Sequence, residues 1–419
     1  MIKIEIITIG DELLIGQIVD SNSTWIAQQC SNIIGIKPSW FSTVGDNYDD
    51  ITNAIQLAYK RADVIFISGG LGPTNDDITK TTLCKFFNSQ LVVDNDVYQD
   101  IETLFKNRGF AMTPLNASQA EVPNNCTVIR NKLGTAPGML FENSNKMLIS
   151  MPGVPFEMKG MFSSFVIPYI QNKYNISKLY YKSVLTQGLG ESFLADKLKD
   201  WENSLPENIS LAYLPSQSIV KLRLTSSGNN FDVEKKQIDN KIQELNAIIG
   251  DLIYGFDEDT LQSVVGTLLL NNKKTIGTIE SCTGGYIAHL ITSVSGSSEY
   301  FNGSIIPYSN QLKNSLLGID NNILETYGAV SMETVEKMLL SGEKLLKTDY
   351  IIAVSGIAGP SGGTPTKPVG TIFIGVRSSK NNKSIIKKYI FGNNREHNII
   401  KTSQTALNML RKLIIEENS

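Results

Sequence analysis

Short apolar runs alternate with amphipathic stretches along the first third of the chain. Residues 2–9, 36–44 and 63–67 are rich in β-branched or aromatic residues, and each run has the length of a buried strand. The stretches 20–27 and 49–61 instead place their apolar residues at helical spacing. Strands and helices that alternate in this way form parallel sheets covered by helices, so the pattern predicts an α/β domain with a parallel sheet. Further strands are expected at 139–141 and 146–151, and a last helix that ends near 170.

The pattern changes after residue 170. Strands are expected at 180–186, 211–214 and 219–225, and helices at 191–201 and 231–250. Along 219–225 apolar residues alternate with charged ones, which is typical of a strand with one buried face. The long second helix carries a single stripe of isoleucine and leucine. This part of the chain, residues 171–254, is therefore predicted to be a small α+β module.

A second α/β pattern fills the rest of the chain after a short acidic segment at 256–259. Strands are expected at 275–279, 303–307, 349–354, 371–376 and 385–391, with helices at 261–270, 286–294, 324–347 and 394–415. The pattern thus divides the chain into domains at 1–170, 171–254 and 255–419, and it predicts an α/β architecture for the first and the third.

Composition places the chain among ordinary globular proteins. Its 419 residues are 41% hydrophobic and 19% charged. A net charge of −3 gives no general attraction to nucleic acid or to an anionic membrane surface. The four cysteines are scattered without CxxC spacing, which argues against a zinc site and favours the reducing cytoplasm. We expect neither a signal peptide nor a membrane span.

The stretch from 275 to 318 carries the clearest candidate chemistry. An apolar strand is followed by Glu280-Ser281-Cys282-Thr283-Gly284-Gly285, which leads into a helix. A hydroxyl at such a junction has two possible roles. Ser281 or Thr283 caps the helix, or Ser281 attacks a substrate. Cys282 is the rival nucleophile.

A nucleophilic serine needs a base. His289 lies eight residues beyond Ser281, about 12 Å along the same helix, which is out of reach. His397 is not excluded by the sequence. Lys313 follows the next expected strand together with Tyr308, so a Ser–Lys pair with the phenol as relay is a candidate.

Loops rich in glycine and proline follow strands of the first domain. They are Gly69-Gly70-Leu71-Gly72-Pro73-Thr74, the loop from Asn131 to Gly134, and Pro152-Gly153. In open parallel sheets, ligands bind outside the carboxyl ends of the strands. Glycines there let the backbone approach a phosphate, and a following helix offers its free amide groups. These loops therefore predict a nucleotide site.

Carboxylates accompany the same loops. Asp46 follows the second strand, and Asp76 and Asp77 follow the glycine run. Grouped carboxylates bind divalent cations, which makes these three residues the candidate metal ligands. Acidic residues at a helix start also cap the helix and complement its dipole, and the sequence leaves this alternative open.

Three motifs of the last domain resemble the C-terminal, nicotinamide-nucleotide amidase domain of the CinA family. They are ESCTGG (280–285), YSNQLK (308–313) and VSGIAGPSGGTPTKPVG (354–370). In the first domain, GDELLIG, VGDN, SGGLGPTNDD, NKLGTAPG and MPGVPFEM resemble that family's molybdopterin-binding-type domain, which is similar to the MoaB and MoeA families. The resemblance covers nearly the whole chain. It implies a MoaB/MoeA-like three-layer α/β domain, a KH-like central module and an α/β amidase domain.

The resemblance implies hydrolysis of the carboxamide of nicotinamide mononucleotide to nicotinate mononucleotide and ammonia, without a cofactor. Ser281 would attack, Lys313 would take the proton with Tyr308 as relay, and backbone amides of 283–285 would stabilise the oxyanion. Substrate binding is expected from Thr283, Gly284, Gly285, Asn310, Ser355, Gly356, Gly359, Gly362 and Arg395. Relatives carry threonine in place of Ser355, so a hydroxyl is kept with a freer rotamer. For Arg395, a surface pair with Glu396 is the alternative.

For the first domain, the resemblance implies an ADP-ribose pyrophosphatase activity that uses a divalent metal. Two alternative functions remain: a pterin- or nucleotide-binding protein without turnover, and an accessory factor of DNA uptake. A cytoplasmic homodimer is expected, with small nucleotides as ligands and no membrane partner. Nucleic acid is not expected as a partner, because Gly188-Leu189-Gly190 lacks the GxxG spacing of RNA-binding KH domains.

Overall fold

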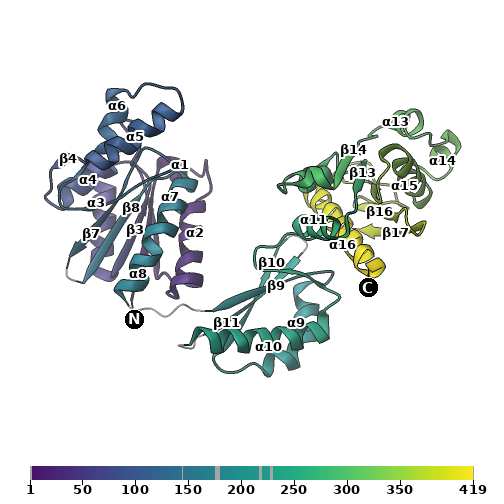
Figure 1. Cartoon of the computed structure of the whole chain (residues 1–419), viewed down its shortest axis with the longest axis horizontal. Helices are drawn as coiled ribbons and strands as arrows, with labels where there is room; N and C mark the ends of the chain where they lie inside the picture. Colours follow the sequence, from purple (N-terminus) through teal and green to yellow (C-terminus); the bar gives the residue numbers. More distant parts are fainter. Residues whose placement is uncertain (1, 144, 175–179, 217–218, 227–229, 419) are drawn as a thin grey trace. The chain divides into compact units, whose positions relative to one another are not determined.

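The computed structural model describes residues 2–143, 145–174, 180–216, 219–226 and 230–418. These residues fold as two compact units (Figure 1). One unit lies within Met1–Tyr180 and Ser227–Glu234, and the other lies within Tyr181–Ser226 and Lys235–Ser419. The second unit therefore contains most of the central module together with the C-terminal domain.

The N-terminal sheet has six strands in the order β2-β1-β3-β8-β7-β6. They are β1 (Ile4–Ile9), β2 (Trp40–Val44), β3 (Val64–Ser68), β6 (Thr127–Ile129), β7 (Gly138–Asn143) and β8 (Lys146–Met151). The first four in that order are parallel, as predicted. The strands β7 and β6, for which the sequence pattern predicted no direction, run antiparallel to their neighbours. The link between β7 and β8 is too short for the crossover that parallel strands require.

Helices cover both faces of this sheet, because alternate strand residues point to opposite sides. The helices are α2 (Ser21–Gln29), α7 (Pro155–Met161) and α8 (Ile167–Lys173) on one face, and α3 (Tyr48–Arg61) and α4 (Thr79–Phe86) on the other. Ile6 and Phe66 pack against the first group, and Ile7 and Ile65 against the second. The predicted three-layer α/β architecture is confirmed. Outside it lie α5 (Asn95–Asn107) and an antiparallel pair, β4 (Leu91–Val93) and β5 (Glu121–Pro123).

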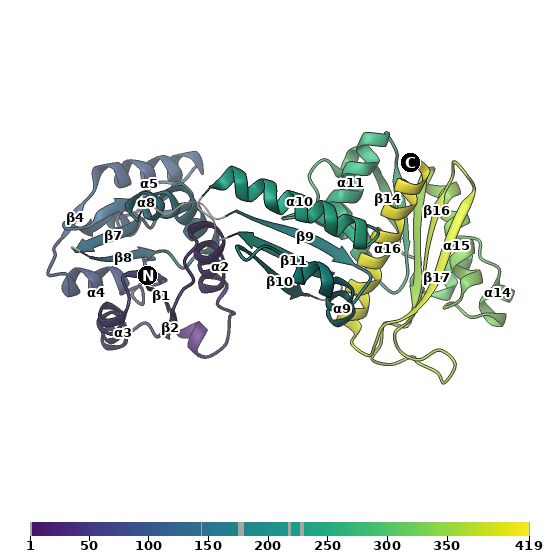
Figure 2. The ribbon, with the colours of Figure 1, turned by 90° about the horizontal axis from the view of Figure 1, so that it is seen from below.

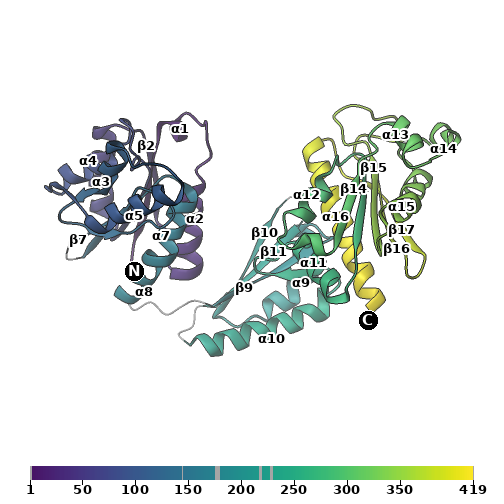
Figure 3. The ribbon, with the colours of Figure 1, turned by 45° about the horizontal axis from the view of Figure 1, so that its top comes forward.

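The central module is an antiparallel sheet with two helices on one face (Figure 3). Its elements are β9 (Tyr181–Gln187), α9 (Glu191–Asn203), β10 (Ile209–Pro215), β11 (Ile219–Ser226), α10 (Phe231–Ile249) and β12 (Ile253–Phe256), with the strand order β10-β11-β9-β12. Val220, Leu222 and Leu224 are buried and alternate with more exposed neighbours, which confirms the predicted one-sided strand. Among the described strands of this module, β12 is the one that the sequence pattern did not predict.

The C-terminal sheet has the order β14-β13-β15-β16-β17. Its strands are β13 (Ile276–Glu280), β14 (Phe301–Ile305), β15 (Tyr350–Gly356), β16 (Thr371–Ser378) and β17 (Lys383–Ile390). The helices are α11 (Leu261–Asn272), α12 (Tyr286–Thr292) and α16 (Arg395–Asn418) against one face, with α14 (Asn321–Thr326) and α15 (Met332–Leu346) against the other. Figure 2 shows α15 and α16 on opposite sides of the strands. Because β13 and β15 are parallel neighbours, the loops that follow Glu280 and Gly356 begin at the same sheet edge.

An ion pair between a buried carboxylate and a partly exposed arginine connects the N-terminal sheet to its helical layer. The fully buried Glu5 carboxylate of β1 accepts hydrogen bonds from Arg61 Nε at 2.8 Å and Nη2 at 2.7 Å. Ser42 Oγ of β2 donates to the same carboxylate at 2.8 Å. Each oxygen of this buried charge therefore has a partner.

We expect Arg61→Ala to lower the free energy of unfolding by about 2–4 kcal/mol, because it leaves the Glu5 carboxylate buried without its cation. Urea denaturation followed by tryptophan fluorescence measures this loss, since two of the three tryptophans lie in this domain. Arg130→Ala is the matched control, because solvent screens the exposed pair of Arg130 and Asp100 and its loss should change stability little. Equal losses in both variants would contradict the prediction.

Candidate active site in the C-terminal domain

Ser281 lies directly after β13 and is not part of the following helix. Its amide donates to the carbonyl oxygen of Val354 at 3.1 Å, which fixes it to the neighbouring strand. Helix α12 begins only at Tyr286, and its N-cap is Gly285, whose φ of 99° suits glycine. The interpretation of Ser281 or Thr283 as a helix cap is therefore wrong. The Ser281 hydroxyl is available for another role.

Lys313 reaches Ser281 from the other side of the site. It belongs to the short helix α13 (Asn310–Ser315), which Ser309 caps by accepting from the Leu312 amide. The Lys313 Nζ atom lies 3.1 Å from Ser281 Oγ, and the lysine side chain is only 1% exposed. The predicted Ser–Lys pair is thus brought into direct contact. Neither histidine lines this pocket.

Two backbone carbonyls complete the surroundings of the lysine amine. Nζ lies 2.9 Å from the Pro307 oxygen and 3.2 Å from the Tyr308 oxygen. A neutral amine has two hydrogens and one lone pair, so it can donate to both carbonyls and accept the Ser281 proton. Burial lowers the pKa of Lys313 below its ordinary value, because desolvation disfavours the ammonium form. Geometry and burial both favour an amine that acts as a base.

Cys282 is also buried and lines the same pocket. Burial raises the pKa of its thiol to about 12, and the nearby Glu280 carboxylate adds to the effect. The thiol is therefore protonated near neutral pH, and a protonated thiol is a poor nucleophile. Between the two candidate nucleophiles, the structure favours Ser281.

Glu280 is a functional residue that sequence reasoning missed. Its carboxylate is fully buried and accepts hydrogen bonds from the turn between β13 and α12. The donors are Thr278 Oγ1 (3.2 Å), Thr283 Oγ1 (2.7 Å) and the amides of Gly285 (3.1 Å), Ile287 (3.0 Å) and Ala288 (2.8 Å). These bonds fix the turn that carries Ser281. The acidic residue directly before a Ser-Cys-Thr-Gly-Gly turn was the only signal in the sequence.

The same bonds correct the predicted oxyanion donors. The Gly284 amide donates to the backbone carbonyl oxygen of Ser281 at 3.2 Å, and the Gly285 amide donates to the side-chain carboxylate of Glu280. Neither is available to a substrate, so the prediction is wrong for these two glycines. The amides of Cys282 and Thr283 donate to no other residue in the described part of the chain, and they remain the candidate donors.

Tyr308 and Arg395 meet at the mouth of the pocket. Arg395 is the first residue of α16, and it donates from Nη2 to the Tyr308 hydroxyl and from Nη1 to the Gly359 oxygen, each at 3.0 Å. The phenol is not hydrogen-bonded to Ser281 or Lys313, so the structure does not support Tyr308 as a proton relay. Arg395 contacts two neutral acceptors rather than Glu396, which rejects the alternative of a surface ion pair with that residue.

The cavity around these residues has a volume of about 210 Å³. Of the predicted binding residues, Asn310, Ser355, Gly356 and Arg395 line it, whereas Thr283, Gly284, Gly285, Gly359 and Gly362 do not. Ser355 is buried and donates its hydroxyl proton to the Ala329 oxygen at 2.7 Å. Sequence reasoning missed Ala329, Val330 and Ala358 as lining residues because apolar side chains carry no chemical signal.

The glycines of the predicted N-terminal site have an internal explanation. A Cβ atom on Gly69 would lie 2.1 Å from the Ile9 oxygen, and one on Gly70 would lie 2.1 Å from Thr79 Oγ1. A Cβ on Gly72 would lie 2.4 Å from an Asp77 oxygen. The close neighbours that demand glycine are thus parts of the chain itself, so these glycines are not evidence for a phosphate.

The other predicted residues of this site form two groups. Pro152 and Gly153 adjoin the glycine run, since the Gly69 Cα atom lies 3.5 Å from a Cβ built on Gly153. Leu71 is buried beside them, whereas Pro73 is half-buried and Thr74 is exposed. Asn131 instead donates to Glu157 at 2.6 Å, and its side-chain oxygen accepts from the Gly134 amide at 3.0 Å.

The candidate metal ligands are not arranged to coordinate a metal ion by themselves. Asp77 accepts from the Thr74 amide and hydroxyl, as a local turn. Asp46 exchanges backbone–side-chain hydrogen bonds with Asp11. Within the described residues, no group of three or more acidic, histidine or cysteine side chains is arranged to hold a metal ion. Burial raises the pKa of Asp46, and the negative charges of Asp11, Glu12 and Asp76 add to this effect.

No helix in the described part of the chain is long and apolar enough to cross a membrane.

The fold and the site define a protein of two α/β domains joined by an α+β module, with a buried serine–lysine pair in the C-terminal domain. The chain belongs to the CinA family. The CinA C-terminal domain matches residues 258–414, the "Probable molybdopterin binding domain" matches 5–172, and the "Damage-inducible protein CinA KH domain" matches 181–255. The predicted fold class is confirmed by these matches.

The similarity to curated relatives extends over the full length. A CinA-like protein of Cytophaga hutchinsonii is 44% identical over 98% of both chains, and one of Flavobacterium psychrophilum is 44% identical over 100% of both. Among solved structures, the competence/damage inducible protein of Agrobacterium tumefaciens is 32% identical and covers 38% of this chain and 94% of its own, with a TM-score of 0.36.

We expect Glu280→Gln to destabilise the turn between β13 and α12 by about 1–3 kcal/mol, because an amide nitrogen cannot accept from the backbone donors. Hydrogen–deuterium exchange of the Ile287 and Ala288 amides, followed by mass spectrometry, measures the effect, and faster exchange is expected. Glu299→Gln is the control, since Glu299 is exposed and its side chain makes no hydrogen bond within the described residues. Unchanged exchange in Glu280→Gln would overturn the assignment.

Proposed function

We propose that the C-terminal domain hydrolyses the carboxamide of nicotinamide mononucleotide, giving nicotinate mononucleotide and ammonia. The observation that carries the proposal is the contact between Lys313 Nζ and Ser281 Oγ, 3.1 Å long and buried in a polar pocket. The resemblance of the three C-terminal motifs to amidase domains suggests the substrate. In this proposal the site needs no metal and no organic cofactor.

The first half-reaction forms an acyl-enzyme. Ser281 Oγ attacks the carboxamide carbon while its proton passes to the neutral amine of Lys313. The oxygen of the tetrahedral intermediate accepts a hydrogen bond from the amide of Cys282, which lines the pocket. The Lys313 ammonium then protonates the amide nitrogen, the carbon–nitrogen bond breaks and ammonia leaves. Lys313 is again neutral at the end of this step.

The second half-reaction hydrolyses the acyl-enzyme and regenerates the free Ser281 hydroxyl. A water molecule attacks the ester carbon, and Lys313 takes the proton of this water. The bond between carbon and Ser281 Oγ breaks, the serine recovers a proton from the ammonium, and nicotinate mononucleotide leaves. The two carbonyls at Pro307 and Tyr308 support this cycle, since they hold the amine in place in both of its protonation states.

Arg395 would bind the phosphate of the substrate. Its guanidinium donates to two neutral oxygens, those of Gly359 and Tyr308, so its positive charge is not cancelled there. It is exposed at the mouth of the pocket, where a phosphate can form charge-assisted hydrogen bonds with it. The Tyr308 hydroxyl would then orient the guanidinium rather than carry protons.

We propose as a second activity that the N-terminal domain cleaves the pyrophosphate bond of ADP-ribose with a divalent metal. Supporting this, Asp11, Asp46 and Asp76 gather negative charge near the carboxyl ends of β1 and β2. Mg²⁺ often binds through one or two carboxylates together with substrate phosphates, so it needs no complete protein cage. The metal would polarise the phosphates, and Asp46 would help to hold it.

The variant Asp46→Asn tests this second activity. It should lose ADP-ribose turnover and retain ammonia release.

We expect Ser281→Ala and Lys313→Met to reduce ammonia release from nicotinamide mononucleotide by at least about 10³-fold, because each removes one half of the reacting pair. Cys282→Ser should retain activity and serves as the neighbouring control. Ammonia is measured by a coupled assay in EDTA, where wild type should remain active. Full activity of Ser281→Ala would refute the serine mechanism, and loss in EDTA would refute metal independence.

The pH profile of kcat/KM should rise as Lys313 loses its proton. Because burial lowers the pKa of Lys313, the rising limb should lie below the ordinary lysine value of about 10.4. Below that limb the ammonium cannot accept the serine proton, and activity should fall about tenfold per pH unit. A profile whose rising limb is absent below the ordinary lysine pKa of about 10.4 would contradict the role of Lys313 as the base.

A further inference from the structure

A second, larger cavity lies within the unit that holds the central module and the C-terminal domain. Its volume is about 630 Å³, three times that of the serine–lysine pocket. One wall is the loop at Gly188-Leu189-Gly190 with the beginning of β11. The opposite wall is the end of β17 and one face of α16. The proposed amidase chemistry makes no use of this cavity.

The cavity wall is cationic. Lys387 of β17 and Lys401 and Lys412 of α16 line it, and none of the three forms an ion pair with a carboxylate in the described part of the chain. Glu191 is the single acidic residue among the described lining residues. In a chain with a net charge of −3, such a group of unpaired lysines indicates an anionic ligand.

The amino end of α9 adds to the positive potential. This helix has 13 residues, and its N-cap, Gly190, provides no side-chain hydrogen bond. The first-turn amides therefore keep donors for an external acceptor, and the helix dipole favours negative charge there. Gly190 and Glu191 both line the cavity, so this helix end opens into it.

Two buried side-chain amides also face the cavity. Gln187 is 5% exposed, and its side chain makes no hydrogen bond to another described residue. Asn408 is 8% exposed; its oxygen accepts from Arg411 Nε at 2.9 Å, while its nitrogen donates to no described residue. The free polar atoms of both amides stay accessible to solvent, so a polar ligand in the cavity can bond to them in place of water.

An aromatic surface completes the lining. The rings of Tyr389 and Phe391 are stacked, with centroids 5.3 Å apart and an interplanar angle of 21°. Both rings are half-buried at the end of β17 and line the cavity. Stacked rings of this kind offer a flat face to a heterocyclic base, as base-stacking sites of nucleotide-binding proteins do.

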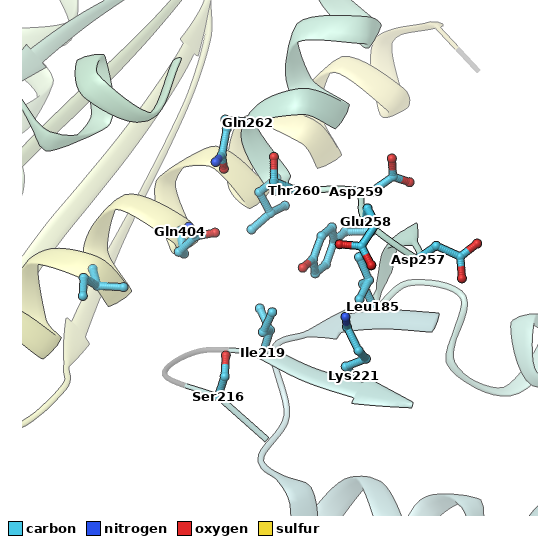
Figure 4. Close-up of a pocket in the computed structure, with 13 residues that line it drawn as sticks. Leu185, Ser216, Ile219, Lys221, Asp257, Glu258, Asp259, Thr260, Gln262 and Gln404 are labelled. Atoms are coloured by element: carbon cyan, nitrogen blue, oxygen red, sulfur yellow. The ribbon is translucent and has the colours of Figure 1, made fainter. Parts of the chain in front are cut away.

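The adjoining pocket shows that the cationic character is local. Figure 4 shows this pocket, which has a volume of about 480 Å³ and shares Ser216 and Ile219 with the cavity. It is lined by the acidic segment Asp257, Glu258 and Asp259, and Lys221 is its only lysine among the described residues. A phosphate would be repelled by these carboxylates. It would therefore be placed on the side of α16 and β17.

We propose that the cavity between α9, β17 and α16 binds a nucleotide. The lysines and the amino end of α9 would hold its phosphates, Tyr389 and Phe391 would stack on its base, and Gln187 and Asn408 would accept and donate hydrogen bonds. The volume lies within the range of small-molecule sites, about 300–1,000 Å³, which favours a free nucleotide over a polynucleotide.

Helix α16 contributes residues both to this cavity and to the serine–lysine pocket. Arg395 begins this helix, and Lys401 follows six residues later, about 9 Å along the axis. The helix is fixed at both ends. Asn398 donates to the Ala358 and Gly392 oxygens, and Glu417 accepts from Tyr350 and Ser378.

Isothermal titration calorimetry of the full-length protein tests the proposal with ADP, GDP, UDP and NAD. At least one should bind below about 1 mM, and the double variant Lys401→Met/Lys412→Met should weaken that affinity at least about tenfold. Asn408→Leu should weaken it as well. Lys337→Met is the control, because Lys337 is an exposed residue of α15, on the opposite face of the sheet. Inorganic pyrophosphate should bind more weakly than the best nucleotide, since it has no base to stack.

Hydrogen–deuterium exchange locates the binding independently of the variants. The nucleotide should protect the described segments 187–191 and 401–412. Binding that is unchanged by the lysine variants, or protection confined to 69–79 or 281–285, would assign it to another site and overturn the proposal. Absence of binding by all four nucleotides would also overturn it. Lysine-dependent binding of oligo(dT) tighter than that of any nucleotide would replace it with a polynucleotide site.

Discussion

The C-terminal site depends on one buried carboxylate, that of Glu280. It ends β13 and gathers the hydrogen-bond donors of the turn, so that the chain leaves the sheet in a single conformation. A buried charge is stable only when its oxygens are fully hydrogen-bonded, and here the backbone amides at the start of α12 provide the bonds. The position of Ser281 follows from this arrangement, because its own amide is fixed to β15 and its neighbours are fixed to Glu280.

The side chains of Glu280 and Lys313 have opposite surroundings. The Glu280 carboxylate accepts hydrogen bonds from side-chain and backbone donors, whereas the buried Lys313 amine faces two carbonyl oxygens and a hydroxyl. Carbonyl oxygens bond an ammonium more strongly than a neutral amine, but the desolvation caused by burial is the larger effect and lowers the pKa of Lys313. A carboxylate beside Nζ would have raised that pKa. The separation of the acid from the lysine is therefore as important as the contact with Ser281.

Much of the fold could be predicted from the sequence because strands and helices leave a periodic pattern. That pattern predicted the α/β N-terminal domain and the one-sided strand β11. The three-layer architecture came from the resemblance to the CinA family, and the pairing of Ser281 with Lys313 came from motifs that are specific in combination. Prediction from the sequence failed where the contact partner of a side chain or backbone amide is set by residues far away along the chain. The Tyr308 hydroxyl contacts Arg395, the Gly284 and Gly285 amides are used internally, and Gly69 and Gly70 are required by Ile9 and Thr79. No spacing rule reveals these contacts.

Helix α16 is 24 residues long, about 36 Å, and is bonded to the domain near its first and its last turn. A helix that is bonded to its domain at both ends resists bending at its middle, because bending would break backbone hydrogen bonds. Arg395 is the first residue of this helix, so its guanidinium at the mouth of the serine–lysine pocket starts from a rigid support rather than from a loop.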